Sequence, residues 1–399
     1  MTRGWRIAST LAVTQTVGYG VLYYSFSVMT LPMERELGWS RGELSGAFSL
    51  ALLLSGLVAI PVGRFVDAHG ARGVMTWGSS LGAFLLLAWS FVTDLTLFYL
   101  IQAGIGLVMA AVLYEVAFTV IAVWFEQERT ERARAMLLVT MLAGLASTIF
   151  IPLATFLVQV MTWREALRVL ALILAVVTVP LHAMVLRRRP KRLDEMPIVN
   201  SHRNNYLARA LRASTFWWLA CAFALDRAAI VTVAAHSVPL LSERGYTPAL
   251  VAAAAGSIGL MQVLGRFLFT PLMTYVSLRT LSGLTFCLHA LALVSLLASS
   301  QPWVVWLFAA LFGVANGAST LARAALVADV YGSVHYGSIN GSMATVIAVV
   351  QTAAPLGAGL VFDLSSSYTP VLWGLALSTL LAALAVTRAR VSGVPGYTD

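Results

Sequence analysis

Residues 95–124 read LTLFYLIQAGIGLVMAAVLYEVAFTVIAVW, with Glu115 as the one charged side chain. A run of about 20 apolar residues matches the roughly 30 Å hydrocarbon core of a bilayer. Lipid offers backbone amides no partners, so such a run must form a helix. Similar runs fill nearly the whole chain, which predicts an all-α polytopic membrane protein with 12 transmembrane helices. The predicted spans are residues 7–31, 43–65, 74–93, 95–124, 135–161, 166–186, 216–241, 249–274, 281–299, 303–330, 339–363 and 370–387.

The composition supports this class of protein. Apolar residues make up 59% of the chain and charged residues 11%, against about 45–50% and 25% in soluble domains. The net charge of +9 could suggest a nucleic-acid partner, but the arginines lie in short segments between spans rather than on one basic face. We therefore expect no nucleic-acid binding. Cys221 and Cys287 fall in different predicted spans, and we expect both to be buried apolar side chains without a metal or disulfide role.

The basic residues predict the orientation in the membrane. With the N-terminus placed in the cytoplasm, 18 of the 26 basic residues fall in inner segments and five in outer ones. The positive-inside rule then places both termini in the cytoplasm. Because the run after Arg3 and Arg6 is too long for a signal-peptide core, we expect it to remain as the first span. We expect the membrane to be the bacterial inner membrane.

The spans divide into two sets of six. We predict an N-terminal six-helix bundle over 1–186, a cytoplasmic linker over 187–215 and a C-terminal six-helix bundle with a short tail over 216–399. The halves resemble copies at an offset of 207 residues, which brings residues 37–40 onto 244–247. Parallel repeats of this kind place a substrate site near the bilayer midplane between the halves. Coincidence among apolar sequences is the alternative.

The most specific motif follows the second span and reads GRFVDAHGAR, residues 63–72. Its predicted gate residues are Gly63, Arg64, Asp67, Gly70 and Arg72. Gly63 would permit a close helix approach, and Gly70 a tight turn. Asp67, just past a helix end, would accept hydrogen bonds from another helix's N-terminus or from an arginine.

This motif resembles the G-x-x-x-D-x-x-G-x-R signature of the major facilitator superfamily, whose transporters carry it between their second and third spans. The local sequence is similar to the bacterial relatives of monocarboxylate transporters and oxalate–formate antiporters within that superfamily. The segments that carry this resemblance are Leu37 to Arg41, Trp163-Arg164, His236 to Pro239 and Tyr336-Gly337. The resemblance implies a monomeric secondary transporter whose first, fourth, seventh and tenth spans line a central cavity.

Ionisable groups inside spans are costly and therefore mark candidate functional sites. Glu115 in span four and Arg323 in span ten fall within one position of each other under the repeat offset. Our hypothesis is that they face each other, with Arg323 binding an anionic substrate and Glu115 holding Arg323 or carrying a proton. A static pair that only stabilises the fold is the alternative.

Polar residues at helical spacing extend this prediction. Asn316 and Thr320 share a helical face with Arg323. In span one, Gln15, Tyr19 and Tyr23 form another face suited to a small organic substrate, although simple helix packing would explain it as well. We assign proton coupling or ion pairing to Asp226, Arg227 and His236 in span seven, and an internal hydrogen-bonding role to His289.

These observations predict secondary active transport of a small organic anion, a monocarboxylate or dicarboxylate, by alternating access with a proton or a counter-anion. The alternative is proton-coupled efflux of a drug-like or toxic compound. We expect no enzyme activity, cofactor or metal, because no phosphate-binding loop, ligand cluster or nucleophile elbow is present. The expected partners are the substrate, the proton or counter-anion and membrane lipid.

Overall fold

The computed structural model describes residues 3–125, 128–186, 209–298, 301–331 and 336–389. All the regular structure in these ranges is helical. The helices of the first half are α1 (Arg3–Tyr19), η1 (Gly20–Tyr24), α2 (Ser25–Leu37), α3 (Arg41–His69), α4 (Ala71–Trp89), α5 (Leu95–Val112), α6 (Tyr114–Trp124), α7 (Arg129–Gly144), α8 (Ala146–Val160) and α9 (Trp163–Val185). Those of the second half are α11 (Ser214–Glu243), α12 (Pro248–Leu272), α13 (Leu278–Ala298), α14 (Pro302–Tyr331), α15 (Tyr336–Ser365) and α16 (Thr369–Arg388).

Each of the twelve predicted spans coincides with a helix or with an interrupted helix. Within the described residues, ten helical segments are long and apolar enough to cross a membrane, counting α5–α6 and α7–α8 as one segment each. The other two predicted spans correspond to α1–η1–α2 and to the 19-residue α4. Of the predicted linker, residues 187–208 lie outside the described residues.

Three spans are interrupted where the sequence predicts continuous helices, and the break in span five is at Leu145, between α7 and α8. Span one contains the π-helical turn η1, and the ring of Phe150 lies where a Cβ on Gly20 would be. Span four breaks at Leu113, whose backbone is extended (φ −89°, ψ −163°). Gln15 donates from Nε2 to the carbonyl of Val112 at 2.7 Å, so a side chain of α1 satisfies the backbone at the break.

The repeat offset of 207 residues recurs in the local structure. Gly38 and Gly245 both have positive φ, at 71° and 80°. Two residues later, Ser40 caps α3 by accepting from Glu43 N, and Thr247 caps α12 by accepting from Leu250 N. The starts of α4 and α13 (71 and 278) and the ends of α6 and α14 (124 and 331) also differ by 207. The halves therefore share helix boundaries as well as residue types.

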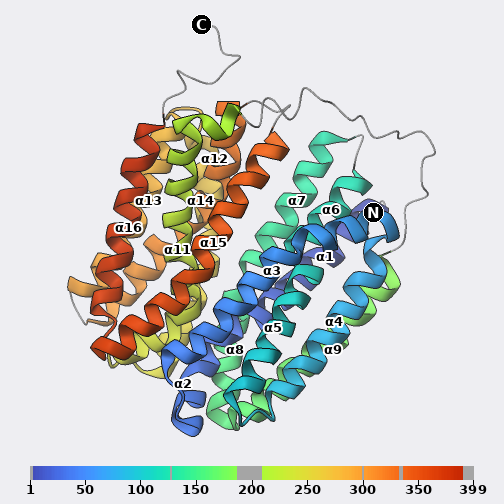
Figure 1. Ribbon diagram of the computed structural model, residues 1–399, viewed down its shortest axis with the longest axis vertical. Helices are drawn as coiled ribbons and strands as arrows, with labels where there is room; N and C mark the ends of the chain where they lie inside the picture. Colours follow the sequence, from blue (N-terminus) through green and yellow to red (C-terminus); the bar gives the residue numbers. More distant parts are fainter. Residues whose placement is uncertain (1–2, 126–127, 187–208, 299–300, 332–335, 390–399) are drawn as a thin grey trace, which may run out of the picture. The chain divides into compact units, whose positions relative to one another are not determined.

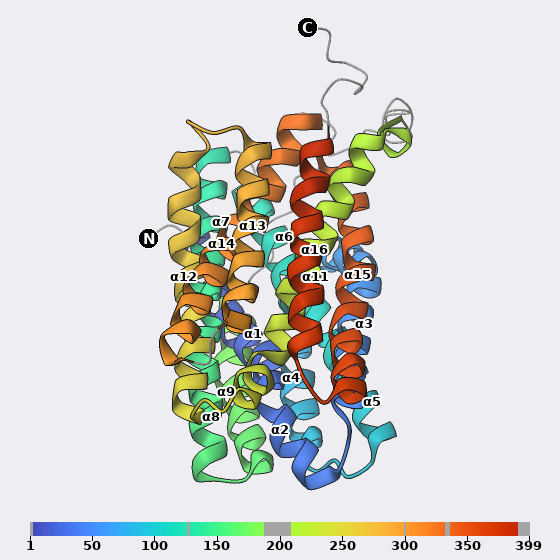
Figure 2. The same ribbon diagram turned by 90° about the vertical axis from the view of Figure 1, so that its left-hand side faces the viewer.

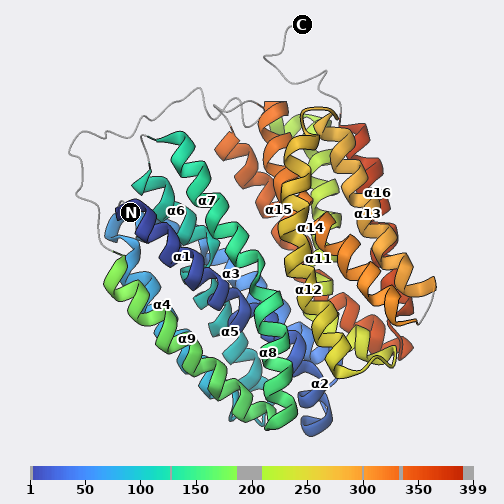
Figure 3. The same ribbon diagram turned by 180° about the vertical axis from the view of Figure 1, so that it is seen from behind.

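The chain packs into two compact units. Unit 1 comprises Met1–Pro190, Ala234–Leu260 and Pro355–Leu364, and unit 2 comprises Lys191–Val233, Met261–Ala354 and Ser365–Asp399. Unit 1 thus combines the first half with one end each of α11, α12 and α15. In unit 1, α4 lies along α9 (Figure 1) and α1 along α7 (Figure 3). In unit 2, α13 packs against α14 and α16 (Figure 2).

Each unit has its own apolar core, and large apolar side chains also cover the outside. The core of unit 1 includes Ile7, Met75 and Ile121, and that of unit 2 includes Phe223 and Phe286. The exposed apolar side chains, among them Phe84, Leu100, Leu172, Leu284 and Leu384, are those expected of a surface that faces lipid. The expectation that Cys221 and Cys287 are buried is wrong, since both are exposed. A small apolar thiol on a lipid-facing surface needs no partner, so burial does not follow from its hydrophobicity.

Glycines let helices approach closely within each half. A Cβ on Gly106 of α5 would lie 2.2 Å from the carbonyl oxygen of Ala51 on α3. A Cβ on Gly317 of α14 would lie 2.0 Å from the carbonyl oxygen of Gln262 on α12. Since both obstacles are backbone atoms of a packed helix, neither position can hold a side chain without separating the two helices.

We therefore predict that Gly317→Ala lowers stability by about 1–3 kcal/mol, the usual cost of overpacking. Thermal unfolding of the purified protein in detergent measures the effect. Gly374→Ala on α16 is the matched control, because a Cβ there meets no atom within 4 Å, and alanine favours a helix interior by about 1 kcal/mol. Equal melting temperatures for the two variants would contradict the close approach of α12 and α14.

Candidate functional site

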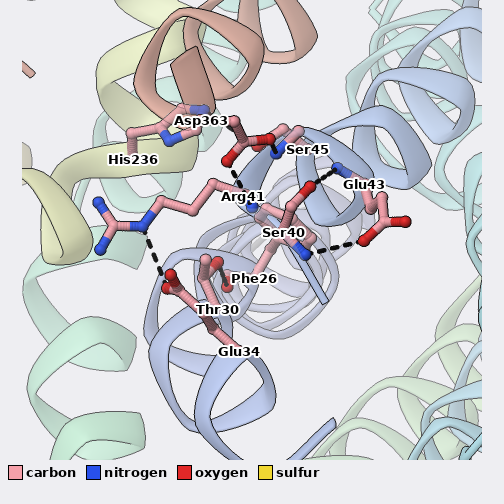
Figure 4. Close-up of polar contacts among 10 residues, drawn as sticks. Phe26, Thr30, Glu34, Ser40, Arg41, Glu43, Ser45, His236 and Asp363 are labelled. Carbon is pink, nitrogen blue, oxygen red and sulfur yellow. Dashed lines mark hydrogen bonds and ion pairs between the residues drawn. The ribbon is translucent and has the colours of Figure 1, made fainter. Parts of the chain in front are cut away.

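The most densely connected polar region is the start of α3, which the predicted orientation places on the outer side. Gly38 ends α2 in the left-handed region. Ser40 and Glu43 then form a capping box: Glu43 N donates to Ser40 Oγ at 3.2 Å and Ser40 N to Glu43 Oε2 at 2.8 Å (Figure 4). This turn fixes the position of Arg41, the first residue of α3.

Asp363, near the end of α15, completes the capping of α3. Its carboxylate accepts from Arg41 N at 3.1 Å and from Gly42 N at 2.8 Å (Figure 4). A carboxylate is unfavourable in the last turn of its own helix, where the macrodipole is negative, and favourable at the N-terminus of another. The position of Asp363 is therefore electrostatically favourable only while the end of α15 lies against the start of α3.

The Arg41 side chain ties three helices together. Its Nε donates to Glu34 Oε2 on α2 at 3.1 Å, and its guanidinium lies over the ring of Phe362 on α15, 3.6 Å from the centroid. Arg41 is only 8% exposed. A buried guanidinium with an acidic and an aromatic partner is a stable arrangement that a lysine could not reproduce.

A serine of α3 and a histidine of α11 bind α15 at its proline. Pro355 lacks an N–H and disturbs the helical hydrogen-bond ladder. Ser49 Oγ of α3 accepts from Leu356 N at 3.2 Å, and one turn earlier Ser45 Oγ lies 3.2 Å from Nε2 of His236 on α11. His236 Nε2 lies 3.1 Å from the Pro355 carbonyl, and because that oxygen can only accept, Nε2 carries the hydrogen.

Two further contacts follow the same pattern. Ser27 Oγ on α2 accepts from Val238 N at 3.0 Å, one residue before Pro239 of α11. Thr148 Oγ1 on α8 donates to the Gly256 carbonyl of α12 at 2.7 Å. We call these contacts the outer gate, comprising Ser27, Glu34, Arg41, Ser45, Ser49, Thr148, His236, Gly256, Pro355 and Asp363. All its residues belong to unit 1.

Glycines again allow backbone contact at the outer gate. A Cβ on Gly359 of α15 would lie 2.7 Å from the Arg41 carbonyl oxygen, and one on Gly259 of α12 would lie 2.5 Å from the Gly144 carbonyl oxygen. α3 and α15 therefore approach closely, and so do α12 and the end of α7. The first-half helices meet the second-half segments here through backbone contacts as well as through the side-chain contacts described above.

The predicted gate motif at the other end of α3 differs from expectation in two respects. The helix continues to His69, so Asp67 lies in its last turn rather than past its end; the stacking of His69 on Phe65, at 4.2 Å between centroids, accompanies this extension. A Cβ on Gly63 meets no atom within 4 Å, so the close approach expected there is absent in this conformation.

The remaining motif residues fit a charged turn. Gly70 has a φ of 84° and links α3 to α4 directly, as expected. Arg64 and Arg72 are exposed. Arg72 in the first turn of α4 opposes the macrodipole of its own helix, so its charge favours an external partner. The role of Asp67 and Arg72 in gating stays a prediction.

Within unit 2, three polar side chains form a buried cluster. Asp226 on α11 is 1% exposed and His289 on α13 is fully buried. The two lie 2.6 Å apart, from Oδ1 to Nδ1, and Ser319 of α14 donates from Oγ to Asp226 Oδ2 at 2.5 Å. Arg227 points elsewhere, donating from Nε to Gln351 Oε1 of α15 at 3.1 Å. The structure therefore brings Asp226 together with His289 and Ser319, and separates it from Arg227 and His236.

The residues of the predicted polar face of span one lie in two different environments. Gln15 is fully buried and binds the helix break at Val112, so its amide faces the interior in this conformation. Tyr19 lies 6.1 Å from Tyr23 and 4.6 Å from Tyr114 between ring centroids. Tyr114 precedes Glu115, which is exposed at the start of α6. Aromatic rings from α1, η1 and α6 thus gather beside the acidic residue.

On α14 the three predicted residues differ in exposure. Asn316 is buried, Arg323 is partly exposed, and Thr320 is exposed and donates to the Asn316 carbonyl at 3.0 Å. Glu115 belongs to unit 1 and Arg323 to unit 2. The proposed pairing of Glu115 with Arg323 therefore stays a prediction.

Sequence reasoning did not select several of the best-connected polar residues. Asp363 was not singled out, Arg41 was named only within the Leu37 to Arg41 segment that carries the family resemblance, and His289 was not linked to Asp226. A signal for Asp363 was available, because an acidic residue in the last turn of a helix is unfavourable unless something else stabilises it. No signal could pair His289 with Asp226, since their contact depends on how α11 packs against α13.

Comparison with known proteins settles the family. A family profile described as Major Facilitator Superfamily matches residues 11–235, more than half of the chain. The chain belongs to the major facilitator superfamily. This transporter is similar over its length to a solved bacterial homologue of the human lysosomal transporter Spinster in an inward-facing, unoccupied conformation. The TM-score is 0.74 at 12% identity, covering 98% of this chain and 96% of the other.

Three curated relatives are also similar. Uncharacterized MFS-type transporter YcxA of Bacillus subtilis is 23% identical over 88% of this chain and 87% of its own length. Uncharacterized transporter YybO of the same organism is 30% identical over 41% of this chain, a match that spans 36% of that relative. The oxalate:formate antiporter of Oxalobacter formigenes is 26% identical over 54% of this chain and 50% of its own length.

We predict that Asp363→Ala opens the outer gate. The substitution removes the carboxylate that caps α3, and the released backbone N–H groups then gain from contact with water. Spin labels at Arg35 and Leu364, both exposed residues of unit 1, measure the separation of α2 from α15 in a variant without Cys221 and Cys287. We expect a larger population at long distance.

Asp94→Ala is the matched control for this experiment. Asp94 also caps a helix, accepting from Leu97 N at 2.9 Å, but that contact stays within its own turn. The control should leave the distance distribution unchanged. Identical distributions for Asp363→Ala and the unsubstituted protein would show that Asp363 does not hold the gate.

Proposed function

We propose that this transporter moves a small organic anion, a monocarboxylate or dicarboxylate, by alternating access, with a proton or in exchange for a second anion. It would act as a monomer in a bacterial inner membrane with both termini in the cytoplasm. Its helices would work as two six-helix bundles joined by the 187–215 linker. The observation that carries the proposal is the charge inside the second half.

That charge is positive. Within the spans of α11, α12 and α14, and away from the helix ends, three arginines stand against one acidic residue: Arg227, Arg266 and Arg323 against Asp226. Arg266 is only 5% exposed and Asp226 1%. Excess positive charge in a region of low dielectric is costly unless an anion compensates it. A substrate carboxylate would supply that compensation and match a guanidinium bidentately.

The relatives favour the same substrate class. One of the three curated relatives described above carries the name oxalate:formate antiporter, and both of those substrates are small carboxylates. The aromatic group of Tyr19, Tyr23 and Tyr114 beside Glu115 would supply apolar surface and hydroxyl donors for the rest of such a molecule.

The two ends of α3 suggest how the transport cycle alternates. On the outer side, an acidic residue in the last turn of α15 caps α3. On the inner side, Asp67 occupies the equivalent position in the last turn of α3. In the opposite state of the cycle, Asp67 would bind a helix N-terminus or an arginine, and Asp363 would no longer cap α3. Each state would then satisfy one of two acids that oppose their own helix dipoles.

We predict that Arg323→Gln reduces carboxylate uptake by about 10–100-fold, because a charge-assisted hydrogen-bonded pair contributes about 1.5–3 kcal/mol. Uptake of labelled oxalate, formate and lactate into proteoliposomes with an imposed pH gradient measures it. Arg323→Lys should recover only part of the activity, since lysine cannot bind bidentately. Glu115→Gln, in the same assay, should slow uptake if Glu115 holds Arg323 or carries a proton.

Arg388→Gln, an exposed arginine in the last turn of α16, is the control and should retain normal uptake. Near-normal uptake in both Arg323→Gln and Glu115→Gln would end the assignment of these residues. Gradient-driven export of apolar cations without any carboxylate transport would instead favour proton-coupled efflux.

A further inference from the structure

The buried cluster of Asp226, His289 and Ser319 has a chemical property that the transport proposal does not use. Both carboxylate oxygens of Asp226 are occupied, one by His289 Nδ1 and one by the Ser319 hydroxyl. His289 Nε2 is buried and has no hydrogen-bond partner among the described residues. The ring lies against Phe312, 4.7 Å away between centroids. The cluster therefore has one open position for a proton, and that position is Nε2.

The net charge of the cluster depends only on Nε2. The hydrogen between Nδ1 and Oδ1 can lie nearer either atom without changing the total charge. Without a proton on Nε2, the pair carries one negative charge; with it, the pair is neutral. In the low dielectric of a membrane protein this difference amounts to a large change in local electrostatic energy.

A purely structural role explains the cluster poorly. His182, between α4 and α9, shows how the protein seats a buried histidine without charge: its Nδ1 lies 2.9 Å from Ser79 Oγ and 3.2 Å from the Met75 carbonyl. Its Nε2 also lacks a partner among the described residues, so an open nitrogen alone does not mark a proton site. The carboxylate is what distinguishes His289. Burying an ionisable acid is costly, and apolar packing would serve stability as well.

The charged residues on the helices around the cluster connect protonation of His289 to the binding of an anion. Arg227 adjoins Asp226 on α11, Arg323 follows Ser319 by one turn on α14, and α12 carries Arg266. The other ionisable side chains of the helices around the cluster lie toward helix ends or outside unit 2, apart from the thiols of Cys221 and Cys287. Among the side chains that the structure describes, they are Arg279 on α13, Asp329 and Tyr331 on α14, His236 and Glu243 on α11, Asp363 on α15 and Arg388 on α16. A proton on Nε2 adds to the positive charge of the three arginines and strengthens anion binding.

We propose that His289 is the proton-carrying residue of this transporter, with Nε2 as the atom that is loaded. Loading forms an N–H bond at Nε2 with a proton taken from hydronium, which leaves as water, and release reverses this step. Asp226 and Ser319 are positioning residues that hold the ring and stabilise its charged form. By linkage, the proton and the anion each favour the binding of the other. This inference rests on the proposed function for the identity of the anion.

The proton site can be tested without any transport. Nuclear magnetic resonance of the full chain with ¹⁵N-labelled histidine, in lipid nanodiscs, reports the protonation of each ring. The His289→Gln variant identifies the His289 signal, and the His182→Gln variant identifies the control. We expect the His289 signal to show a proton gained at Nε2 as the pH is lowered, and this pH dependence to change in Asp226→Asn. A His289 ring with one protonation state at every pH at which the protein stays folded, unaffected by Asp226→Asn, would overturn the proposal.

Transport assays distinguish a loss of proton coupling from a loss of substrate binding. In proteoliposomes, a pH gradient should drive at least 10-fold less accumulation of labelled oxalate, formate or lactate by His289→Gln than by the unsubstituted protein. The variant should retain exchange of labelled for unlabelled substrate at equal pH. His182→Gln should retain both. If His289→Gln does not fold, Asp226→Asn, which keeps the shape of the side chain, takes its place.

The outcomes distinguish the two proposals. Normal gradient-driven accumulation in His289→Gln or in Asp226→Asn would overturn the role of His289 and leave anion transport standing. Absence of transport of all three carboxylates by the unsubstituted protein would overturn the substrate class. The resonance titration would then still decide whether His289 takes up a proton.

Discussion

Water is absent from the hydrocarbon core of a bilayer, and a polar group of this chain at that depth is costly unless it finds a partner in the protein. Because of this constraint the membrane-spanning segments are helices, whose backbone groups form hydrogen bonds with one another. Where a helix is interrupted, a side chain from another helix replaces the missing partner, as Gln15 does at the break after Val112. Where proline disturbs the ladder, serines of α2 and α3 bind the nearby amides. The polar side chains of the spans therefore mark the places where helices bend and meet.

The same constraint suits the outer gate to the opening and closing that the proposed transport cycle requires. Its contacts join backbone groups near Pro239 and Pro355 to hydroxyls of the first half, and the start of α3 to Asp363. None of these groups can be left unpaired in an apolar medium. At the membrane surface, water can replace each partner when the helices separate, and Gly359 of α15 lets its backbone lie against the backbone of α3. A close but water-replaceable contact suits a gate better than a packed apolar interface would.

Charged side chains inside the second half depend more strongly on partners within the protein, because water is less available there. Asp226 is fully engaged by His289 and Ser319, and Arg227 by Gln351. The arginines outnumber the acid in these spans, so the proposed anion would balance positive charge, and the proposed proton, which adds positive charge, would strengthen the binding of that anion. Coupling between them then requires no moving relay, only a shared electrostatic environment.

The sequence by itself determined the class, the number of spans and the repeat, because each is a property of residues close together in the chain. Apolar length gives the spans, and Gly38 and Gly245 with their capping residues recur at one offset and adopt the same left-handed conformation. Only the tertiary structure decided which polar residues meet. Asp226 pairs with His289, 63 positions away, and Asp363 with the start of α3, more than 320 positions away. The intervening helices carry no periodic pattern that encodes such contacts, since they follow from which helix faces pack together.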